Sequence, residues 1–306
     1  MDSQTSIDVY QLVTDQIIAL LEKGVIPWQK PWTDAGVPMN MFSKRHYRGI
    51  NLWLLLSLNY ERNLFLTWDQ IKSVGGSVNK GEKGQIVVFW KPVQKKTDEQ
   101  PGDTQKQVPM LRYYKVFNIS QCRDIPEHLI PAIETVGVDQ FTPDMECEVI
   151  ITSMSDAPTI VHKEQKAYYS IDSDVINMPK KKSFKSVDSY YHILFHELVH
   201  STGVEKRLGR KTLKDMVGFG CPSYALEELI AEMGSAYLCR FAGILPTELA
   251  DAVAYIDGWL DVFKKDRRFL ITASGQAQKA VDFILGRKEE ESKEEVSESK
   301  EEPLVS

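Results

Sequence analysis

The sequence predicts an α+β protein with two domains and an acidic tail. The first half shows an amphipathic helix, short helices and a strand pair, whereas the second half shows short strands followed by long helices. Prolines and a glycine punctuate the chain between them, over residues 124–145. We therefore expect domains at residues 1–128 and 129–288 and a tail at 289–306. A chain of 306 residues with 42% hydrophobic content is long enough to form two cores.

In the first domain, apolar residues recur at helical spacing from residue 7 to about residue 23, and Gly24 ends this helix. An irregular aromatic loop follows over residues 27–32. Further expected elements are helices at 51–57 and 68–74, strands at 85–91 and 111–116, and a flexible excursion at 94–108.

The second domain is expected to begin with two short strands at 167–171 and 174–179. Because Pro179 cannot donate a hydrogen bond to a sheet, the second strand should end at a sheet edge. Such an edge beside a helix offers a place where an extended peptide can pair. Expected helices run from the capping residue Ser186 to Gly203, over 224–241, and within a C-terminal segment at 247–285. The small sheet should pack on the first two of these helices.

The most informative motif is His196-Glu197-Leu198-Val199-His200, within the first of these helices. Residues four apart lie on one helix face, so His196 and His200 can both present a ring nitrogen to one metal ion. Glu197 then lies beside the open coordination position, where it can serve as the general base. The motif predicts a metallopeptidase-type site with Glu197 as its catalytic residue. The alternative is a buried helix whose histidines make core hydrogen bonds.

A catalytic zinc site usually has three protein ligands, so a third donor is expected downstream. The dense carboxylate cluster there spans Glu227 to Glu232, inside a helical pattern. Glu228 and Glu232 are four residues apart and share a face, whereas Glu227 is expected to point elsewhere. We interpret Glu228 as the third ligand and Glu232 as an acceptor that orients a ligand histidine. Exchange of these two roles, or an ordinary solvated helix face, are the alternatives.

His192 lies one turn before His196 and is a candidate for the pocket wall or for support of a ligand. We do not count it as a ligand, because three stacked imidazoles would have to converge across roughly 12 Å of helix rise. Two imidazoles and a carboxylate suit Zn²⁺, and they also admit Mn²⁺ or Co²⁺.

Charge and composition narrow the class of protein. Residues 289–306 hold eight glutamates and two lysines, which accounts for the whole net charge of −6 and predicts a disordered tail. No apolar run is long enough to span a bilayer, and the amino terminus lacks a signal-peptide pattern. The cysteines are scattered without a CxxC pair, so they are expected to be reduced packing residues: Cys122, Cys147, Cys221 and Cys239. We expect a cytoplasmic protein without a membrane partner.

The first domain is both aromatic and basic. It contains five of the six tryptophans, and residues 1–128 carry 16 basic against 13 acidic side chains. Rings interleaved with cations are typical of a groove for single-stranded nucleic acid, because bases stack on aromatics while Lys and Arg follow the phosphates. Burial in the core is the alternative use of these tryptophans. The candidate DNA contacts are Trp32, Lys44, Arg45, Tyr47, Arg48, Lys80 and Lys83.

The arrangement resembles that of ArdC-type antirestriction proteins of conjugative elements. The resemblance rests on a string of motifs that together span most of the chain. They are Pro27 to Trp32, Tyr47 to Asn51, Trp68 to Gly76, Gly81 to Lys83 with Val87 to Lys91, Val116 to Asn118, Asp174 to Pro179, His196 to Gly203 with Arg207 and Leu208, and Tyr224 to Glu232.

This resemblance implies an N-terminal domain that binds single-stranded DNA and a C-terminal zincin-like metallopeptidase domain. It implies protection of incoming DNA during conjugation, and it leaves the protein substrate unidentified. In one hypothesis the chain is a metal-dependent peptidase recruited to DNA. In the other it is a DNA-binding protection factor whose metal site is structural. Retention of Glu197 favours the first, because a structural ion needs no base and is usually closed by four protein ligands.

Overall fold

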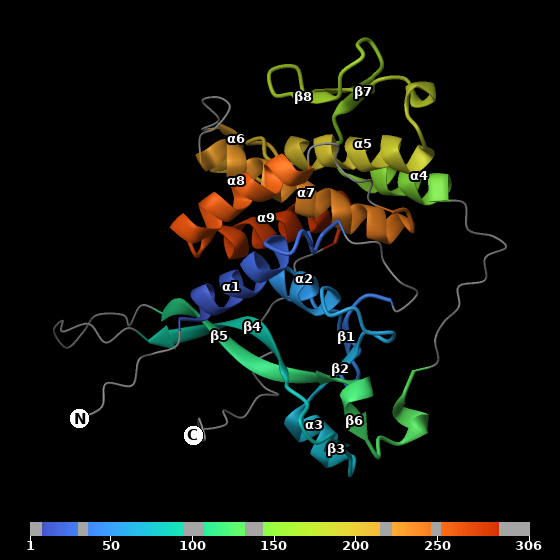
Figure 1. Ribbon diagram of the computed structural model, residues 1–306. Helices are drawn as coiled ribbons and strands as arrows, with labels where there is room; N and C mark the ends of the chain where they lie inside the picture. The colour runs from blue at the N-terminus through green and yellow to red at the C-terminus, as the bar shows by residue number, and fades with distance from the viewer. Residues whose placement is uncertain are drawn as a thin grey trace.

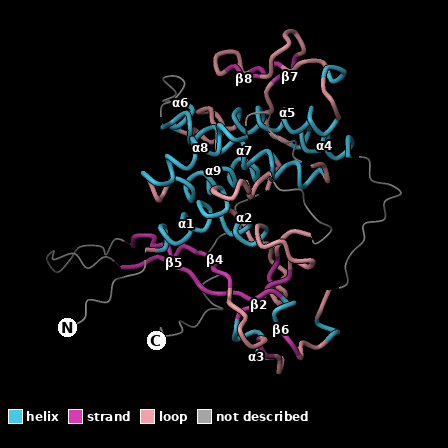
Figure 2. Tube along the Cα trace, viewed as in Figure 1, coloured by secondary structure: helices cyan, strands magenta, loops and turns pink. Residues whose placement is uncertain are grey.

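The computed structural model describes residues 8–29, 36–94, 107–131, 143–214, 222–245 and 252–287. Its elements are stacked in layers, with helices in the middle and a sheet on either side (Figure 1). Figure 2 shows the same order by colour, with strands at the two ends of the stack and helices between them. The mixed α and β architecture expected from the sequence is confirmed.

Helix α1 (Val9–Leu21) forms as predicted, with slightly shorter bounds. The Asp8 side chain caps it by accepting a hydrogen bond from the Tyr10 N–H at 3.1 Å. Gly24 follows the last turn with a φ of +72°, a conformation that glycine adopts without strain. The buried residues Val9, Val13 and Ile17 recur at helical spacing and face the layer of C-terminal helices.

The N-terminal half contains a four-stranded sheet in the order β1-β2-β5-β4. Its strands are β1 (Met39–Asn40), β2 (Leu64–Thr67), β4 (Gln85–Gln94) and β5 (Gln107–Asn118). The predicted strand pair is therefore present but longer than expected, because residues 107–110 pair with residues 91–94, although 94, 107 and 108 were expected in the flexible excursion. Residues 95–106 lie outside the described ranges.

A smaller unit flanks this sheet. Helix α3 (Trp68–Ser73) begins with a capping box, in which the Thr67 and Gln70 side chains each accept from the other residue's backbone N–H. It packs beside a two-stranded sheet of β3 (Ser77–Val78) and β6 (Cys122–Arg123). Two 3₁₀ turns, η1 (Ile119–Gln121) and η2 (Glu127–Leu129), complete this region.

Asn51, in the first turn of helix α2 (Ile50–Leu56), covers the outer strand β4. Its amide donates to the Val88 carbonyl at 2.7 Å and accepts from the Val88 N–H at 2.7 Å. An outer strand presents unpaired backbone groups on one side, and one side chain here satisfies both groups of Val88. Asn51 thereby fixes α2 against the sheet.

The C-terminal half begins with helix α4 (Pro143–Ser153), which the sequence interpretation missed, and a three-stranded sheet. The strands are β7 (Thr159–Val161), β8 (Tyr168–Ser170) and β9 (Val175–Asn177) in the order β7-β9-β8. The expectation that the second predicted strand ends at an edge is wrong, because β9 is the central strand. It pairs with β7, which was not predicted, and Pro179 lies beyond its last residue.

The remaining chain is helical. A 3₁₀ turn, η3 (Lys181–Ser183), leads into α5 (Val187–Ser201), α6 (Lys211–Lys214), α7 (Pro222–Ala242), α8 (Ala252–Lys265) and α9 (Phe269–Ile284). Helix α7 packs between α5 and α9, and β8 and β9 contact α5. The expected helices at 186–203, 224–241 and 247–285 are thus confirmed in type and approximate position. None of the helices in the described ranges combines the length and hydropathy that a bilayer span requires.

One large apolar cluster joins the two halves of the chain. It contains residues of α1 and α2 together with residues of α4, α5, α7, α8 and α9. The Trp28 ring packs edge-on against Trp259, with centroids 5.2 Å apart, and Trp53 packs against Tyr237 at 4.9 Å. Two smaller clusters belong to the N-terminal half alone. The central core is therefore built by both halves.

Replacing Asn51 should destabilise the fold. In Asn51→Ala, both backbone groups of Val88 lose their partner, and we expect a loss of about 2 kcal/mol in the free energy of unfolding. Urea unfolding followed by circular dichroism measures this value. Gln11→Ala removes an exposed amide on α1 and should change it by less than about 0.5 kcal/mol. Equal stability of the Asn51 variant and the wild type would contradict the covering role.

Candidate metal centre

Helix α5 carries both histidines of the motif on one face. The Ser186 side chain caps the helix by accepting from the Ser189 N–H at 3.1 Å. Tyr190, Leu194 and Leu198 are buried on the side that packs into the core. His196 and His200 lie one turn apart, with their ring centroids 4.7 Å apart.

Helix α7 brings the carboxylates to the histidines, and a glycine sets how closely it can approach. A Cβ atom on Gly234 would lie 2.7 Å from a methyl carbon of Val199, nearer than real Cβ contacts come. The missing side chain therefore lets the backbone of α7 press against α5. Glu232 and Glu228 lie two and six residues before Gly234 in α7, at the level of the histidines.

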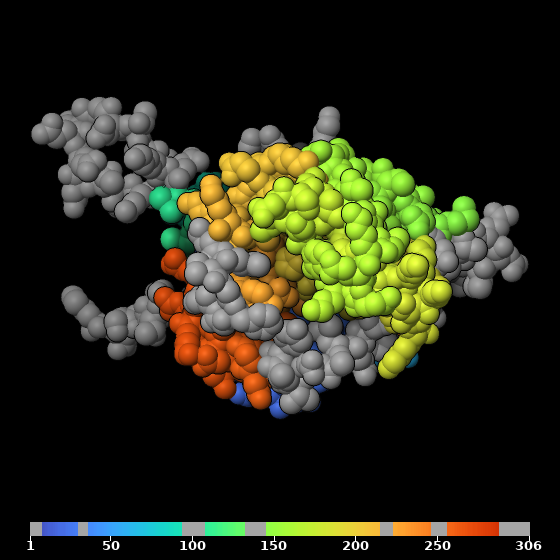
Figure 3. Space-filling model, turned by 90° about the horizontal axis from the view of Figure 1, so that it is seen from above, coloured from blue at the N-terminus to red at the C-terminus, as the bar shows by residue number. Residues whose placement is uncertain are grey.

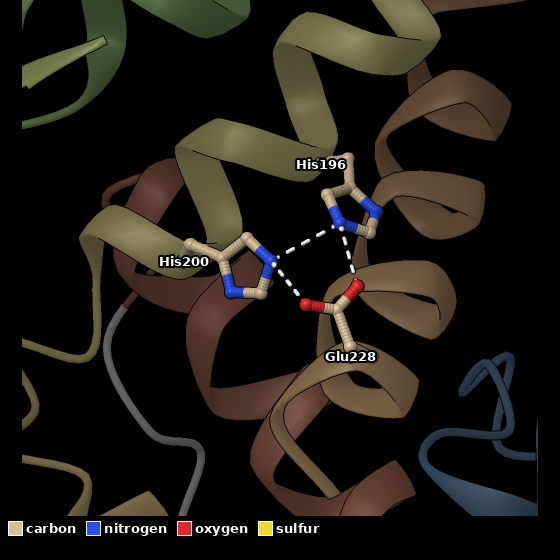
Figure 4. Close-up of side chains that lie close together, drawn as sticks. All are labelled: His196, His200 and Glu228. Atoms are coloured by element: carbon tan, nitrogen blue, oxygen red, sulfur yellow. Dashed lines mark hydrogen bonds and ion pairs between the residues drawn. The ribbon is translucent and has the colours of Figure 1, made fainter. Parts of the chain in front are cut away.

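The Glu228 carboxylate lies between the two imidazoles (Figure 4). Its oxygens are 3.5 Å from His196 Nε2 and 3.6 Å from His200 Nε2, and the two Nε2 atoms are 3.1 Å apart. In a tetrahedral zinc site with ligands about 2.0–2.2 Å from the ion, neighbouring donor atoms are about 3.3–3.6 Å apart. The donor spacing thus fits a divalent cation within a few tenths of an ångström.

The other nitrogen of each ring also faces a carboxylate. His196 Nδ1 lies 3.3 Å from Glu232 Oε1, and His200 Nδ1 lies 3.3 Å from Glu227 Oε1. A carboxylate favours a proton on the nitrogen that it faces, which leaves the Nε2 lone pairs pointing toward each other. A proton or a metal cation between the two Nε2 atoms makes this arrangement favourable. The structure therefore brings Glu228 and Glu232 to the positions expected of them.

Glu227 is the residue whose position was predicted wrongly. It is fully buried and faces His200, because Arg210 reaches it from the loop after α5. Burial raises the pKa of Glu227, but hydrogen bonds from His200 and Arg210 outweigh this effect and lower the pKa to about 2. The adjacent Glu227-Glu228 pair was visible in the sequence. Helix periodicity alone could not show that one of these carboxylates pairs with Arg210 from another segment.

Electrostatics at the donors also suit a cation. Burial raises the pKa of Glu228, but its contacts with the two histidines outweigh this effect and hold the pKa below its ordinary value. Burial lowers the pKa of His196, and its hydrogen bonds to Glu228 and Glu232 raise it well above the ordinary value. The site thus presents the ionised Glu228 carboxylate to the position between the rings, and in the metal-free protein a proton on His196 takes the place that a cation would fill.

Glu197 and His192 occupy different surroundings on α5. Glu197 is partly exposed, next to His196 in the chain, whereas His192 is buried one turn earlier. Desolvation is the main cause that lowers the pKa of His192, so its neutral form is favoured.

The three donors that lie within 4.8 Å of one another, among the described residues, are His196, His200 and Glu228. From above, the molecule is hollowed between the yellow-green segment of the three-stranded sheet and the amber segment that follows α5 (Figure 3).

In the structure, some of the candidate DNA contacts are exposed, whereas others are buried or held in an ion pair. Lys44, Arg45, Lys80 and Lys83 are exposed, and Trp32 lies outside the described residues. Tyr47 is buried, with its ring edge-on to Phe65, so this ring is not available for stacking on a base. Arg48 forms an ion pair with Asp282 of α9. The Tyr47-Arg48 motif was interpreted as part of a binding surface. The sequence shows that an aromatic and a basic residue are present, but it does not show whether they are packed in the core or line a groove.

Two exposed aromatic residues were missed. Phe42 is 40% exposed in the turn after β1, and Trp68 is 38% exposed in the first turn of α3. The Asn40 and Gln70 side-chain amides hydrogen-bond each other, at 3.0 and 3.3 Å, and so tie this turn to α3. Lys44 and Arg45 belong to the same turn, and Lys72 lies over the Trp68 ring at 5.0 Å. We call Phe42, Lys44, Arg45, Trp68 and Lys72 the α3 patch.

Comparison with known families assigns both halves. Residues 7–117 match the family described as the N-terminal domain of anti-restriction factor ArdC, and residues 147–276 match the zincin-like metallopeptidase family. The chain is similar to the crystal structure of the antirestriction ArdC protein from plasmid R388, with a TM-score of 0.73 and 35% identity, over 91% of this chain and 97% of that one. An Mn(II)-bound structure of the same protein has a TM-score of 0.73 and 34% identity, over 92% and 98% of the two chains.

Curated relatives extend this comparison. Protein y4eC of Sinorhizobium fredii is 31% identical over 96% of both chains. A DNA primase TraC of Escherichia coli is 31% identical over 96% of this chain, which spans 28% of that primase. The fold and the site define a zincin-like metallopeptidase domain joined to an ArdC-type N-terminal domain. The chain belongs to the ArdC antirestriction family.

The donor geometry predicts one divalent cation per chain. We expect His196→Ala, His200→Ala and Glu228→Ala each to weaken Mn²⁺ or Zn²⁺ binding by more than about 100-fold, the upper range for loss of an outer partner. Isothermal titration calorimetry measures the affinity, and elemental analysis measures the stoichiometry. His162→Ala, which removes an exposed histidine near the Met178 carbonyl, should bind like the wild type. Unchanged affinity in the three ligand variants would contradict the site.

Proposed function

We propose that this chain is a single-stranded-DNA-binding antirestriction protein with a metal-dependent peptidase site. The observation that carries the proposal is the convergence of His196, His200 and Glu228, with Glu197 next to His196 in the chain. Such a donor set on this motif is typical of metallopeptidases. Membership of the ArdC family supports the antirestriction role and a DNA-binding N-terminal half.

His196, His200 and Glu228 would hold the cation. When bound, a divalent cation would act as a Lewis acid that polarises the scissile carbonyl and lowers the pKa of water. Glu197 acts as the general base that removes a proton from the attacking water and returns it to the leaving amine. Glu232 and Glu227 keep the imidazoles in the required tautomer and orientation.

Two observations favour a catalytic over a structural ion. The described residues bring three protein donors together, whereas structural zinc sites are usually closed by four. His196 and Glu228 are also partly exposed, so the site is not sealed inside the core. The donor set suits zinc, and the R388 relative was crystallised with Mn(II). We therefore propose Zn²⁺ or Mn²⁺ as the cofactor, with Co²⁺ as a further substitute.

For DNA binding, we propose the α3 patch as the contact surface. Its two exposed rings can contact bases, with Lys72 lying over the Trp68 ring beside them, and its three cations can follow the phosphates. Asp69 is the acidic neighbour in the same helix. Lys80 and Lys83 extend the positive charge into the turn after β3, the strand that packs beside α3. In this function the protein coats incoming single strands during conjugation, and its peptidase site acts on a protein near them.

Removing the base should stop proteolysis while leaving the metal bound. In Glu197→Gln we expect cleavage of fluorescein-labelled casein or of a purified restriction endonuclease to fall by at least about 100-fold, because general-base catalysis contributes that much. Metal content should equal that of the wild type. Glu205→Gln, an exposed change in the loop after α5, is the matched control. Equal cleavage by the wild type and Glu197→Gln would contradict the peptidase role.

DNA binding should prefer single strands and weaken steeply with salt. By fluorescence anisotropy with a 30-nucleotide strand, we expect Trp68→Ala and Phe42→Ala each to lower the affinity about 5-fold to 100-fold, through loss of base stacking. Trp90→Ala removes a ring that is 46% exposed on the β4–β5 hairpin and should have little effect. Equal affinity for duplex DNA, or no salt dependence, would argue against a stacking surface. Equal losses in the Trp90 and Trp68 variants would argue against this patch.

A further inference from the structure

A buried ion pair lies directly behind His200. The side chains of Arg210 and Glu227 are 2% and 0% exposed. Arg210 Nε donates to Glu227 Oε2 at 3.1 Å, and its Nη2 donates to Oε1. The same Oε1 faces His200 Nδ1. Arg210, Glu227 and His200 therefore form a continuous chain of contacts that ends at a proposed metal donor.

Arg210 also forms hydrogen bonds with the C-terminal end of helix α5. Its Nη2 donates to the Val199 carbonyl at 2.9 Å, and its Nη1 donates to the Thr202 hydroxyl oxygen. A cation is favourable at a helix C-terminus, where the carbonyls lack partners in the helix. The guanidinium thus joins the last turn of α5, which holds His200, to the first part of α7, which holds Glu228.

The surroundings leave the carboxylate of Glu227 little freedom. Thr212 donates its hydroxyl to Glu227 Oε2, so Arg210 and Thr212 together occupy that oxygen. A Cβ on Gly203 would lie 2.9 Å from Arg210 Nη2, so this glycine leaves room for the guanidinium. The need for glycine here is space, because Gly203 is not among the residues with positive φ.

We propose that Arg210 is a positioning residue for the metal centre, acting through Glu227 on His200. This inference rests on the proposed metal site. Without the guanidinium, the Glu227 carboxylate would lose two of its hydrogen bonds and would be free to turn away from His200. It would then no longer hold a proton on His200 Nδ1, and the lone pair of Nε2 would lose its fixed direction. Arg210 keeps the Glu227 carboxylate in place beside His200.

Arg207, three residues earlier, provides a matched comparison. Its side chain is 0% exposed, it binds both oxygens of Asp174 at 2.8 Å, and it donates to the Ser201 carbonyl at 2.8 Å. It therefore ties the same loop to the same helix with the same chemistry. Asp174, however, contacts Tyr169 and Lys206 rather than a proposed ligand. Loss of Arg207 should cost stability without a specific effect on the metal.

The test compares Mn²⁺ affinity, by isothermal titration calorimetry, with the stability of the metal-free protein in urea. We expect Arg210→Gln and Glu227→Gln to weaken Mn²⁺ binding about 10-fold to 100-fold, the range for partners of a ligand histidine. Thr212→Val removes one hydrogen bond and should weaken it about threefold. Arg210→Lys keeps the charge without the fork and should fall between wild type and Arg210→Gln. Arg207→Gln should lower the urea midpoint and leave Mn²⁺ affinity within about twofold.

A second readout reports on His200 directly. In long-range ¹H–¹⁵N spectra of the metal-free protein, His200 should be the Nδ1–H tautomer in the wild type and a mixture of tautomers in Arg210→Gln. Equal Mn²⁺ affinities of the Arg207 and Arg210 variants, or an unchanged tautomer, would overturn the inference. If Arg210→Gln does not fold, Glu227→Gln and Thr212→Val decide by the same readouts. Failure of the wild type itself to bind Mn²⁺ and Zn²⁺ would instead overturn the proposed metal site.

Discussion

The C-terminal half is organised around two imidazole rings, each held between carboxylates from the neighbouring helix. Glu232 and Glu227 face the Nδ1 atoms, and Glu228 faces both Nε2 atoms. This arrangement requires α5 and α7 to lie in close contact along their length, which the Gly234 and Val199 contact permits. Carboxylates and imidazole rings are thereby concentrated where two core helices meet, and the apolar cluster around them fixes the distance between the helices.

The parts of this site that the sequence predicted are those that follow from the geometry of a single helix. His196 and His200 are four residues apart, as are Glu228 and Glu232, and periodicity places each pair on one face. The contribution of Glu227 depends on Arg210, which comes from a loop and meets α7 through tertiary packing. The position of β9 in its sheet was hidden for the same reason, because its neighbour β7 is a three-residue strand with little pattern of its own.

In the N-terminal half, the sequence predicted the residue types of a binding surface but not which of these residues are exposed. Its tryptophans suggested a surface, yet Trp28 and Trp53 are buried in the core that both halves share. In the motif from Tyr47 to Asn51, Tyr47 fills a core cluster, Arg48 pairs with Asp282, and Asn51 satisfies Val88. Sequence composition identifies rings and cations, but only packing separates those that face solvent from those that connect the layers. Phe42 and Trp68 remain on the outside because their backbone lies in a turn and in the first turn of a short helix.

Because the two halves share one core, recombination that separates them should be unfavourable. Helices α1 and α2 pack on α7, α8 and α9, the Gly49 N–H donates to Gln278, and Arg48 pairs with Asp282. A recombination point between the halves would leave large apolar faces open to water on both products. Shuffling of genes should therefore move the two halves together as one cassette. In the TraC primases the matching region indeed spans 96% or 90% of this chain, embedded in much longer proteins.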